Sequence, residues 1–173
     1  WLKGISSDEP GADQVFLDLE DAVAPNAKKA ARAQIVAALR GLDWTGKVRC
    51  VRINDLRTRY AYDDIIEVVK GAGEVLDTIM IPKVMDARDI HFVETLLAQL
   101  ELDLGLKQQI GIEALIEEVH GMKNVDRIAQ ASPRLEALIF GMGDYSASQK
   151  MDMRSVGGTT GYLVACALLF LTL

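Results

Sequence analysis

The stretch from Val15 to Asp21 reads VFLDLED, an apolar run of strand length that ends directly in two carboxylates. Four further runs of strand length follow along the chain: Val48 to Ile53 (VRCVRI), Thr78 to Ile81 (TIMI), Ile110 to Ile116 (IGIEALI) and Leu135 to Phe140 (LEALIF). The starts at positions 15, 48, 78, 110 and 135 lie 33, 30, 32 and 25 residues apart. A strand with its crossover helix occupies roughly 30 residues, so the first strand is predicted over Val15 to Leu19 and opens a repeated βα unit.

The segments between these runs have features of helices. Asn26 is a candidate cap for a helix over Ala27 to Arg40. Asp86 is a candidate cap for a helix over Ala87 to Leu100, in which apolar residues recur on one face. Two more helices are expected, over Asp63 to Lys70 and Gly121 to Gln130. Strands that alternate with helices predict a parallel sheet covered by helices.

Polar or ionisable groups follow every predicted strand. The strand ends carry Glu20 and Asp21, Asn54 and Asp55, Pro82 and Lys83, Glu117 and Glu118, and Gly143 and Asp144, and the second strand itself contains Arg52. Barrel enzymes assemble their sites from several strand ends, whereas a doubly wound sheet binds a nucleotide in one crevice, and no GxGxxG or P-loop motif is present. A complete barrel takes about 250 residues. We therefore predict an α/β fold, an incomplete TIM (β/α)8 barrel with about five βα units, in a single partial domain over residues 1–173.

Composition and charge exclude several classes of function. Half of the 173 residues are apolar and 25% are charged, and 19 Lys and Arg against 25 Asp and Glu give a net charge of −6. This balance argues against nucleic acid as a partner. Cys50 and Cys166 are too few and too far apart for a disulfide framework, which suggests a reducing, cytoplasmic location. The apolar tail from Leu163 to Leu173 is shorter than the roughly 20 residues of a membrane span, so we interpret it as a core segment and expect no membrane association.

Glu117 and Asp144 follow two successive strands, so their carboxylates are expected to converge. Two hard oxygen donors with open positions for water and substrate suit Mg²⁺. The alternative is that each carboxylate stabilises the start of the helix that follows it.

Arg52 lies inside an apolar strand and needs an anionic partner, either a substrate carboxylate or enolate, or Glu20 or Asp21 from the neighbouring strand end. Lys83 is a candidate Schiff-base nucleophile. An ion pair with nearby acids is the favoured interpretation, because those acids would keep the lysine protonated.

The remaining candidates are weaker. His91 is expected on the solvated face of its helix, and His120 in a loop or a first helical turn, so a metal site with two histidines is disfavoured. No Gly-x-Ser-x-Gly elbow is present. Ser146 and Ser148 are expected to cap a helix and not to act as nucleophiles.

Five strand-end motifs, in this order, resemble the HpcH/HpaI aldolase and citrate lyase β-subunit superfamily. The motifs are Phe16-Leu17-Asp18-Leu19-Glu20-Asp21-Ala22-Val23, Val51-Arg52-Ile53-Asn54, Ile79-Met80-Ile81-Pro82-Lys83-Val84, Glu113-Ala114-Leu115-Ile116-Glu117 and Gly141-Met142-Gly143-Asp144-Tyr145-Ser146-Ala147-Ser148. Three segments most resemble its malyl-CoA and methylmalyl-CoA lyase branch: Asp89-Ile90-His91-Phe92-Val93, Ala131-Ser132-Pro133-Arg134 and Val156-Gly157-Gly158. The similarity covers about residues 11–164 and leaves an atypical tail over 165–173.

The resemblance implies a barrel enzyme that depends on Mg²⁺ or Mn²⁺ and makes or breaks a carbon–carbon bond next to a CoA thioester. A malyl-type ester would be interconverted with acetyl-CoA or propionyl-CoA and glyoxylate. Glu117 and Asp144 would bind the metal, and Arg52 would stabilise the enolate, held in place by Glu20 and Asp21. Gly143, Asp144 and Lys83, with Arg52, would contact the substrate.

The same resemblance implies that part of the CoA site, the remaining strands and an acidic lid residue donated by a neighbouring subunit lie outside this chain. The complete protein is expected to be a homo-oligomer. Two alternatives stay open, a citrate lyase β subunit that acts on an acyl-carrier-protein thioester, and a truncated fragment without catalytic activity.

Overall fold

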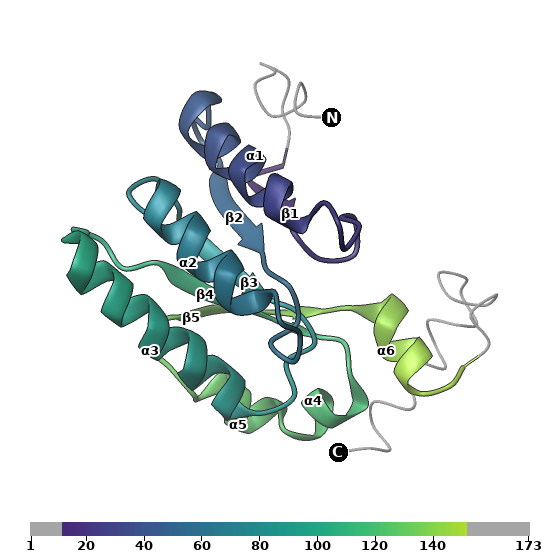
Figure 1. Ribbon diagram of the computed structural model, residues 1–173. Coiled ribbons are helices and arrows are strands. Elements are labelled where there is room, and N and C mark those ends of the chain that lie inside the picture. The colour runs from purple at the N-terminus through teal and green to yellow at the C-terminus, as the bar shows by residue number, and fades with distance from the viewer. Residues whose placement is uncertain (1–11, 152–173) are drawn as a thin grey trace.

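The computed structural model describes residues 12–151. The tail from Leu163 to Leu173, Cys166 and the Val156-Gly157-Gly158 segment lie outside the described residues. Within residues 12–151, parallel strands form one sheet in the order β1-β2-β3-β4-β5 (Figure 1): β1 (Gln14–Asp18), β2 (Val48–Arg52), β3 (Thr78–Ile81), β4 (Gly111–Ile116) and β5 (Leu135–Phe140). The strand order follows the chain without reversal. This order is that of a barrel wall and not of a doubly wound sheet.

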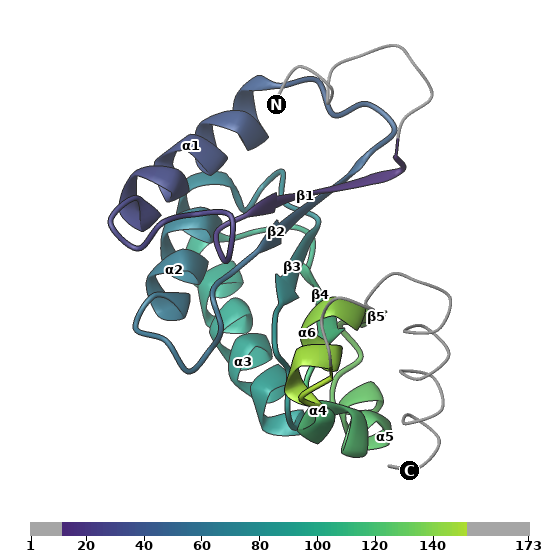
Figure 2. The ribbon, with the colours of Figure 1, turned by 90° about the vertical axis from the view of Figure 1, so that its right-hand side faces the viewer.

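Three long helices pack on one face of the sheet: α1 (Lys28–Gly41), α2 (Ala61–Ala72) and α3 (Ala87–Leu104). They lie side by side in Figure 1, and Figure 2 shows them on the same side of the strands. Three short helices follow the last two strands: α4 (Val119–Lys123), α5 (Val125–Ala129) and α6 (Met142–Ser148). No helix within residues 12–151 is long and apolar enough to cross a membrane.

The two faces of the sheet differ in what they bury. On the face covered by the helices, the side chains of Val51, Ile79 and Ile112 are buried in the main hydrophobic core. Cys50, Met80 and Leu115 form a smaller cluster with a different set of neighbours. Since successive side chains of a strand point to opposite faces, this second cluster lies on the face that would line the inside of a barrel.

Several predicted helix ends are wrong. Asn26 does not cap α1, whose N-cap position is Ala27 and carries no side-chain hydrogen bond. The helix expected over Gly121 to Gln130 is two helices that meet at Asn124. The α2 helix is two residues longer at each end than Asp63 to Lys70. Helix propensity and the spacing of apolar residues predict where a helix lies more accurately than where it ends, because the ends depend on local hydrogen bonds.

The cap at Asp86 is confirmed, because its side chain accepts a hydrogen bond from the Arg88 N–H at 3.1 Å. The expected helix cap is wrong for Ser146, but Ser148 does accept a hydrogen bond at the start of a helix, α4. The Ser146 hydroxyl donates to the Met142 carbonyl inside α6, and the Ser148 hydroxyl accepts from the Val119 N–H in the first turn of α4.

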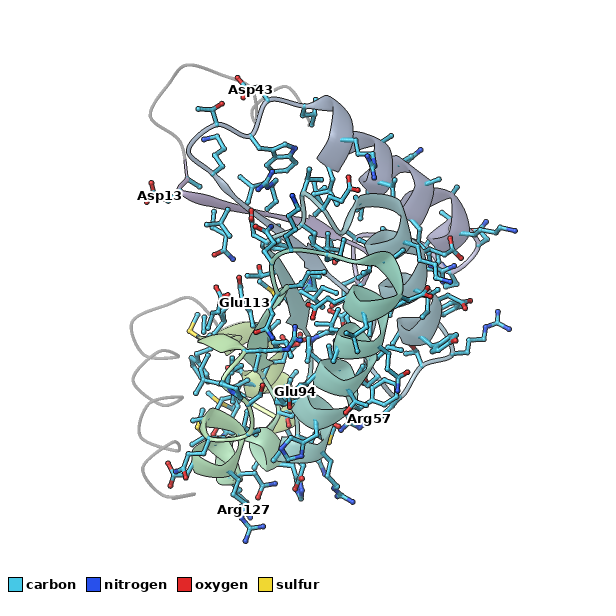
Figure 3. The ribbon with its side chains drawn as sticks, turned by 90° about the vertical axis from the view of Figure 1, so that its left-hand side faces the viewer. Asp13, Asp43, Arg57, Glu94, Glu113 and Arg127 are labelled. Carbon is cyan, nitrogen blue, oxygen red and sulfur yellow. The ribbon has the colours of Figure 1, made fainter. Side chains whose placement is uncertain are left out.

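The strands share one direction, so their carboxyl ends gather at one end of the molecule. Figure 3 shows Asp13 and Asp43, which precede β1 and β2, at the opposite end from Arg57, which follows β2. The polar groups that follow the strands therefore meet at one rim of the sheet, and any site built from them must lie there.

Candidate active site

Hydrogen bonds and ion pairs join residues from all five strand ends. We call these residues the mouth cluster: Asp18, Glu20, Asp21, Arg52, Lys83, Glu117 and Asp144. The contacts between them span 32 to 63 positions of sequence, so the parallel sheet and not the local chain brings them together. A pocket of about 440 Å³ lies beside the cluster and is lined in part by Glu20, Asp21 and Lys83. A larger pocket of about 640 Å³ lies near Trp44 and Asp77 and shares no residue with the cluster.

Arg52 is held mainly by Asp18, a partner that the sequence analysis missed. Its Nε and Nη2 atoms donate to the two Asp18 carboxylate oxygens at 2.8 and 2.7 Å, a bidentate pair. The expected contact with Glu20 is confirmed at 3.3 Å. This second contact is an electrostatic one, because Glu20 Oε2 is buried and accepts no hydrogen bond.

The register of the sheet explains the missed partner. Asp18 and Arg52 are opposite each other in neighbouring parallel strands. Leu17 and Leu19 face the helices, so Asp18 and Glu20 must share the other face. The alternation of apolar and acidic residues in VFLDLE places Asp18 and Glu20 on one face. Pairing Asp18 with Arg52 also requires the register between the first two strands, which the sequence does not give.

Lys83 is the most connected residue of the cluster. Its ammonium lies 2.5 Å from Glu20, 3.7 Å from Asp21 and 3.4 Å from Asp144. Desolvation opposes the charged form, but the hydrogen bond and charge of Glu20 more than offset it and raise the pKa of Lys83 above its ordinary value. The ion-pair interpretation of Lys83 is confirmed, and the protonated amine lacks the free electron pair of a Schiff-base nucleophile.

Glu117 is buried at the end of β4. Its Oε1 accepts a hydrogen bond from the Lys83 backbone N–H at 3.0 Å, so it does not cap the helix that follows. Burial, together with the negative charges of Asp144 and Glu20, raises the pKa of Glu117 to about 7. Gly141 packs so closely that a Cβ there would lie 2.7 Å from Glu117 Oε2.

The residues present fit a divalent cation. Glu117 and Asp144 both contact Lys83, and Glu117 Oε2 takes part in no recorded hydrogen bond. Asp144 lies in the first turn of α6 with 44% of its side chain exposed, so its oxygens are reachable from solvent. A buried carboxylate whose proton affinity is raised by neighbouring charges gains from a hard cation, which binds one or two carboxylates and leaves positions for other ligands.

Other candidates lie outside the cluster or at its edge. His91 and His120 are exposed on α3 and α4, and no group of three or more His, Cys, Asp or Glu residues able to hold a metal is found within residues 12–151. Gly143 has open space where a Cβ would lie. Asp21 is exposed and reaches the cluster through Lys83 alone.

A second buried network, also missed from the sequence, supports the mouth cluster from the helix side. Asp64 is fully buried and accepts hydrogen bonds from Arg32 Nε at 2.7 Å and from the backbone and side chain of Asn54 at 2.9 and 2.6 Å. Lys28 is buried and donates to the Leu19 and Glu20 carbonyls at 2.6 Å. These bonds fix the chain just after β1 and β2.

Comparison with known proteins places this geometry in a family. The family model described as HpcH/HpaI aldolase/citrate lyase matches residues 7–167. An L-malyl-CoA/β-methylmalyl-CoA lyase from Cereibacter sphaeroides is 44% identical over 148 residues, which are 86% of this chain and 46% of the relative. A citrate lyase subunit β from Leuconostoc mesenteroides is 35% identical over 143 residues, covering 81% of this chain and 46% of the relative.

A solved structure of a citrate lyase from Burkholderia xenovorans superposes with a TM-score of 0.73 at 22% identity, covering 82% of this chain and 44% of that one. At that identity the match supports the fold alone. The chain spans about half the length of the curated relatives it matches. The family match over most of the chain and the strand-end motifs agree, and the chain belongs to the HpcH/HpaI aldolase/citrate lyase family.

Proposed function

We propose that this chain forms the metal-binding part of a carbon–carbon lyase that acts on a malyl-type CoA thioester and interconverts it with acetyl-CoA or propionyl-CoA and glyoxylate. The observation that carries the proposal is a chain of contacts at the carboxyl ends of the strands: Glu117, Asp144 and Glu20 all contact Lys83, and Glu20 also contacts Arg52. The name of the relative at 44% identity, a malyl-CoA lyase, supports the same substrate class.

In the proposed site Glu117 and Asp144 hold Mg²⁺, for which Mn²⁺ would substitute. When bound, the ion supplies Lewis-acid polarisation of the carbonyl and carboxylate oxygens of the oxo acid. Glu117 is suited to this role because Lys83 and Gly141 fix its position. The backbone at Gly143 and Asp144 would hold the substrate carboxylate.

Arg52 would stabilise the negative charge that develops on the thioester oxygen. Cleavage of the carbon–carbon bond leaves its electron pair on the α-carbon of the acyl thioester, and the charge spreads to that oxygen as an enolate. A guanidinium has five N–H donors, and Asp18 occupies two of them. The bidentate pair fixes the plane of the guanidinium, so its remaining N–H groups, of which Nη1 lies 3.3 Å from Glu20, would need little reorganisation to meet the developing charge.

The acids around Arg52 and Lys83 would keep both cations in place. Glu20 contacts both of them, and burial raises its pKa despite the opposing effect of Lys83. Asp21 would add a weaker contact at the rim, and Lys83 would add positive charge where an anionic substrate enters. Glu20 and Asp21 are thus proposed to act through Arg52 and Lys83.

A citrate lyase β subunit, acting on an acyl-carrier-protein thioester, is the second candidate function because a relative of that name is 35% identical. The higher identity to the malyl-CoA lyase favours the CoA thioester.

The test uses a chimera, because the chain spans about half the length of its relatives. Residues 14–150 replace the matching segment of the Cereibacter sphaeroides lyase, and glyoxylate released from malyl-CoA in the presence of Mg²⁺ is measured as its phenylhydrazone. We expect turnover, and we expect Arg52→Lys to lower it about a hundredfold or more, as for loss of one oxyanion donor. Asp103→Asn, on the exposed side of α3, is the matched control and should leave turnover unchanged.

Near-normal turnover of the Arg52→Lys chimera would contradict the enolate-stabilising role, because Lys has a point charge in place of the planar fork. A chimera that cleaves a citryl thioester on the acyl carrier protein and ignores malyl-CoA would favour the second candidate.

A further inference from the structure

Lys83 has a backbone conformation that lysine rarely adopts. Within residues 12–151 it is one of two non-glycine residues with positive φ, at 51°, and the other is Lys150 at 60°. A side chain in this left-handed region is strained, and glycine would remove the strain. A lysine is therefore costly here unless its ammonium is needed.

The surrounding structure fixes the segment that carries Lys83. Arg57 donates to the Lys83 carbonyl at 3.2 Å and to Asp89 at 2.9 Å, and Asp89 accepts from the Met85 N–H at 2.8 Å. Asn124 donates to the Met85 carbonyl at 2.8 Å. Groups from the β2–α2 loop, α3 and the α4–α5 junction therefore hold this turn in place.

Charge in the mouth cluster is strongly unbalanced without Lys83. The cluster has five carboxylates and two cations, and one of these, Arg52, is committed to Asp18 in a bidentate pair. Within the described part of the chain, the Lys83 ammonium is the one cationic group within 4 Å of Asp144. It also donates a hydrogen bond to Glu20 Oε1, so the same ammonium offsets the charge of a second carboxylate of the cluster.

We infer that Lys83 is a built-in counter-ion that limits cation binding at the mouth and keeps the metal-bound site open to an anionic ligand. This inference rests on the proposed metal site at Glu117 and Asp144. The ammonium neutralises Glu20 and competes for Asp144, so it weakens metal binding. The same charge attracts a carboxylate ligand that approaches the metal. Lys83 thus weakens the binding of the metal ion and strengthens the binding of the carboxylate ligand.

Because the two affinities should change in opposite directions, binding measurements alone can test the role of Lys83. Mn²⁺ affinity is measured by electron paramagnetic resonance on the 173-residue chain, and glyoxylate affinity is then measured on the Mn²⁺-loaded protein. For Lys83→Met we expect Mn²⁺ to bind about tenfold more tightly and glyoxylate about tenfold more weakly, the size of effect that one unit charge at this range produces. Lys83→Arg keeps the charge and should retain most of the glyoxylate affinity.

Lys150→Met is the matched control, since Lys150 has the same backbone conformation and no recorded ion pair within residues 12–151; neither affinity should change. Lys83→Gly removes the ammonium and also the strain of a side chain at positive φ. It should bind Mn²⁺ more tightly and glyoxylate more weakly, as Lys83→Met does, and its melting temperature should be at least as high as that of Lys83→Met. This second variant keeps the test informative if the Met variant folds poorly.

Three outcomes separate the possibilities. Opposite shifts in the two affinities support the inference. A loss of both affinities, or no change in either, overturns it and assigns Lys83 a structural role or none, while the proposed metal site stands. Failure of the unsubstituted chain to bind Mn²⁺ overturns the proposed site itself, and the inference with it.

Discussion

Replacing Asp18 with Asn tests the pair that holds Arg52. The substitution keeps the shape of the side chain and one oxygen acceptor, but it removes the charge and one of the two hydrogen bonds at 2.8 and 2.7 Å. Arg52 then keeps Glu20 at 3.3 Å as its remaining anionic contact. We expect the folded state to be destabilised and the guanidinium to lose its fixed plane.

The size of the effect follows from burial. The Arg52 and Asp18 side chains are 16% and 6% exposed, so the pair is mostly, but not fully, removed from water. Removing one partner of a fully buried pair costs about 3–5 kcal/mol, and an exposed pair contributes about 0–1 kcal/mol. Because Glu20 remains and Asn can still accept a hydrogen bond, we expect a loss of about 2 kcal/mol in the free energy of unfolding.

The pH dependence has a definite sign. Burial acts to raise the pKa of Asp18, but hydrogen bonds from Arg52 and from the Glu20 and Ala22 N–H groups outweigh it and lower the pKa below 3.8. A carboxyl whose pKa is lowered on folding contributes stability above its unfolded pKa, and that stability is lost as pH falls through the folded value. The difference between the unsubstituted chain and Asp18→Asn should therefore be largest near neutrality and shrink below about pH 4.

Urea unfolding followed by circular dichroism at several pH values measures this difference. Asp103→Asn, which removes an exposed carboxylate on α3, is the control and should stay within about 0.5 kcal/mol of the unsubstituted chain. If Asp18→Asn is as stable as that control at pH 7, or if its loss of stability persists unchanged at acidic pH, the charged Asp18–Arg52 pair does not stabilise the fold as proposed.

Two further predictions concern buried positions. Burial, together with the negative charge of Glu113, raises the pKa of the Cys50 thiol to about 12, so Cys50 should react with a disulfide reagent at pH 8 only after denaturation; fast labelling of the folded chain, in a variant without the second cysteine, would contradict its burial. At Gly121 a Cβ would lie 2.1 Å from the Val84 carbonyl oxygen, so Gly121→Ala should cost about 1–3 kcal/mol in a urea titration. Gly41→Ala, with open space around it, should not be destabilising, and equal effects of the two glycine substitutions would disprove the close approach.

The sheet could be predicted from sequence because its strands are short, apolar and separated by helices. Thr78–Ile81 and Leu135–Phe140 were located to the residue, and the other three strands to within one residue at either end. The polar strand ends predicted a barrel, and the sequential order of the parallel strands agrees with that prediction. Strands buried on both faces give continuous apolar runs, which are a strong signal.

The partners within the site were harder to predict because they depend on register and loop conformation. Asp18 was missed as the main partner of Arg52, although the two lie opposite each other in the sheet. The sequence predicted an ion pair for Lys83, but it did not show that the ammonium would bond Glu20 or that the backbone N–H would donate to Glu117, from a residue with positive φ. The residue types were predictable, and their pairing followed from the three-dimensional structure.

Diffraction at the manganese edge can show whether Glu117 and Asp144 bind a metal ion together. Crystals of the chain soaked in Mn²⁺ should show one anomalous peak bonded to carboxylate oxygens of both residues, at about the 2.0–2.2 Å expected for a small divalent ion. The peak should be absent from crystals of Glu117→Gln. An ion bound elsewhere in the chain, or a peak that persists unchanged in Glu117→Gln, would show that Glu117 and Asp144 are not the metal ligands.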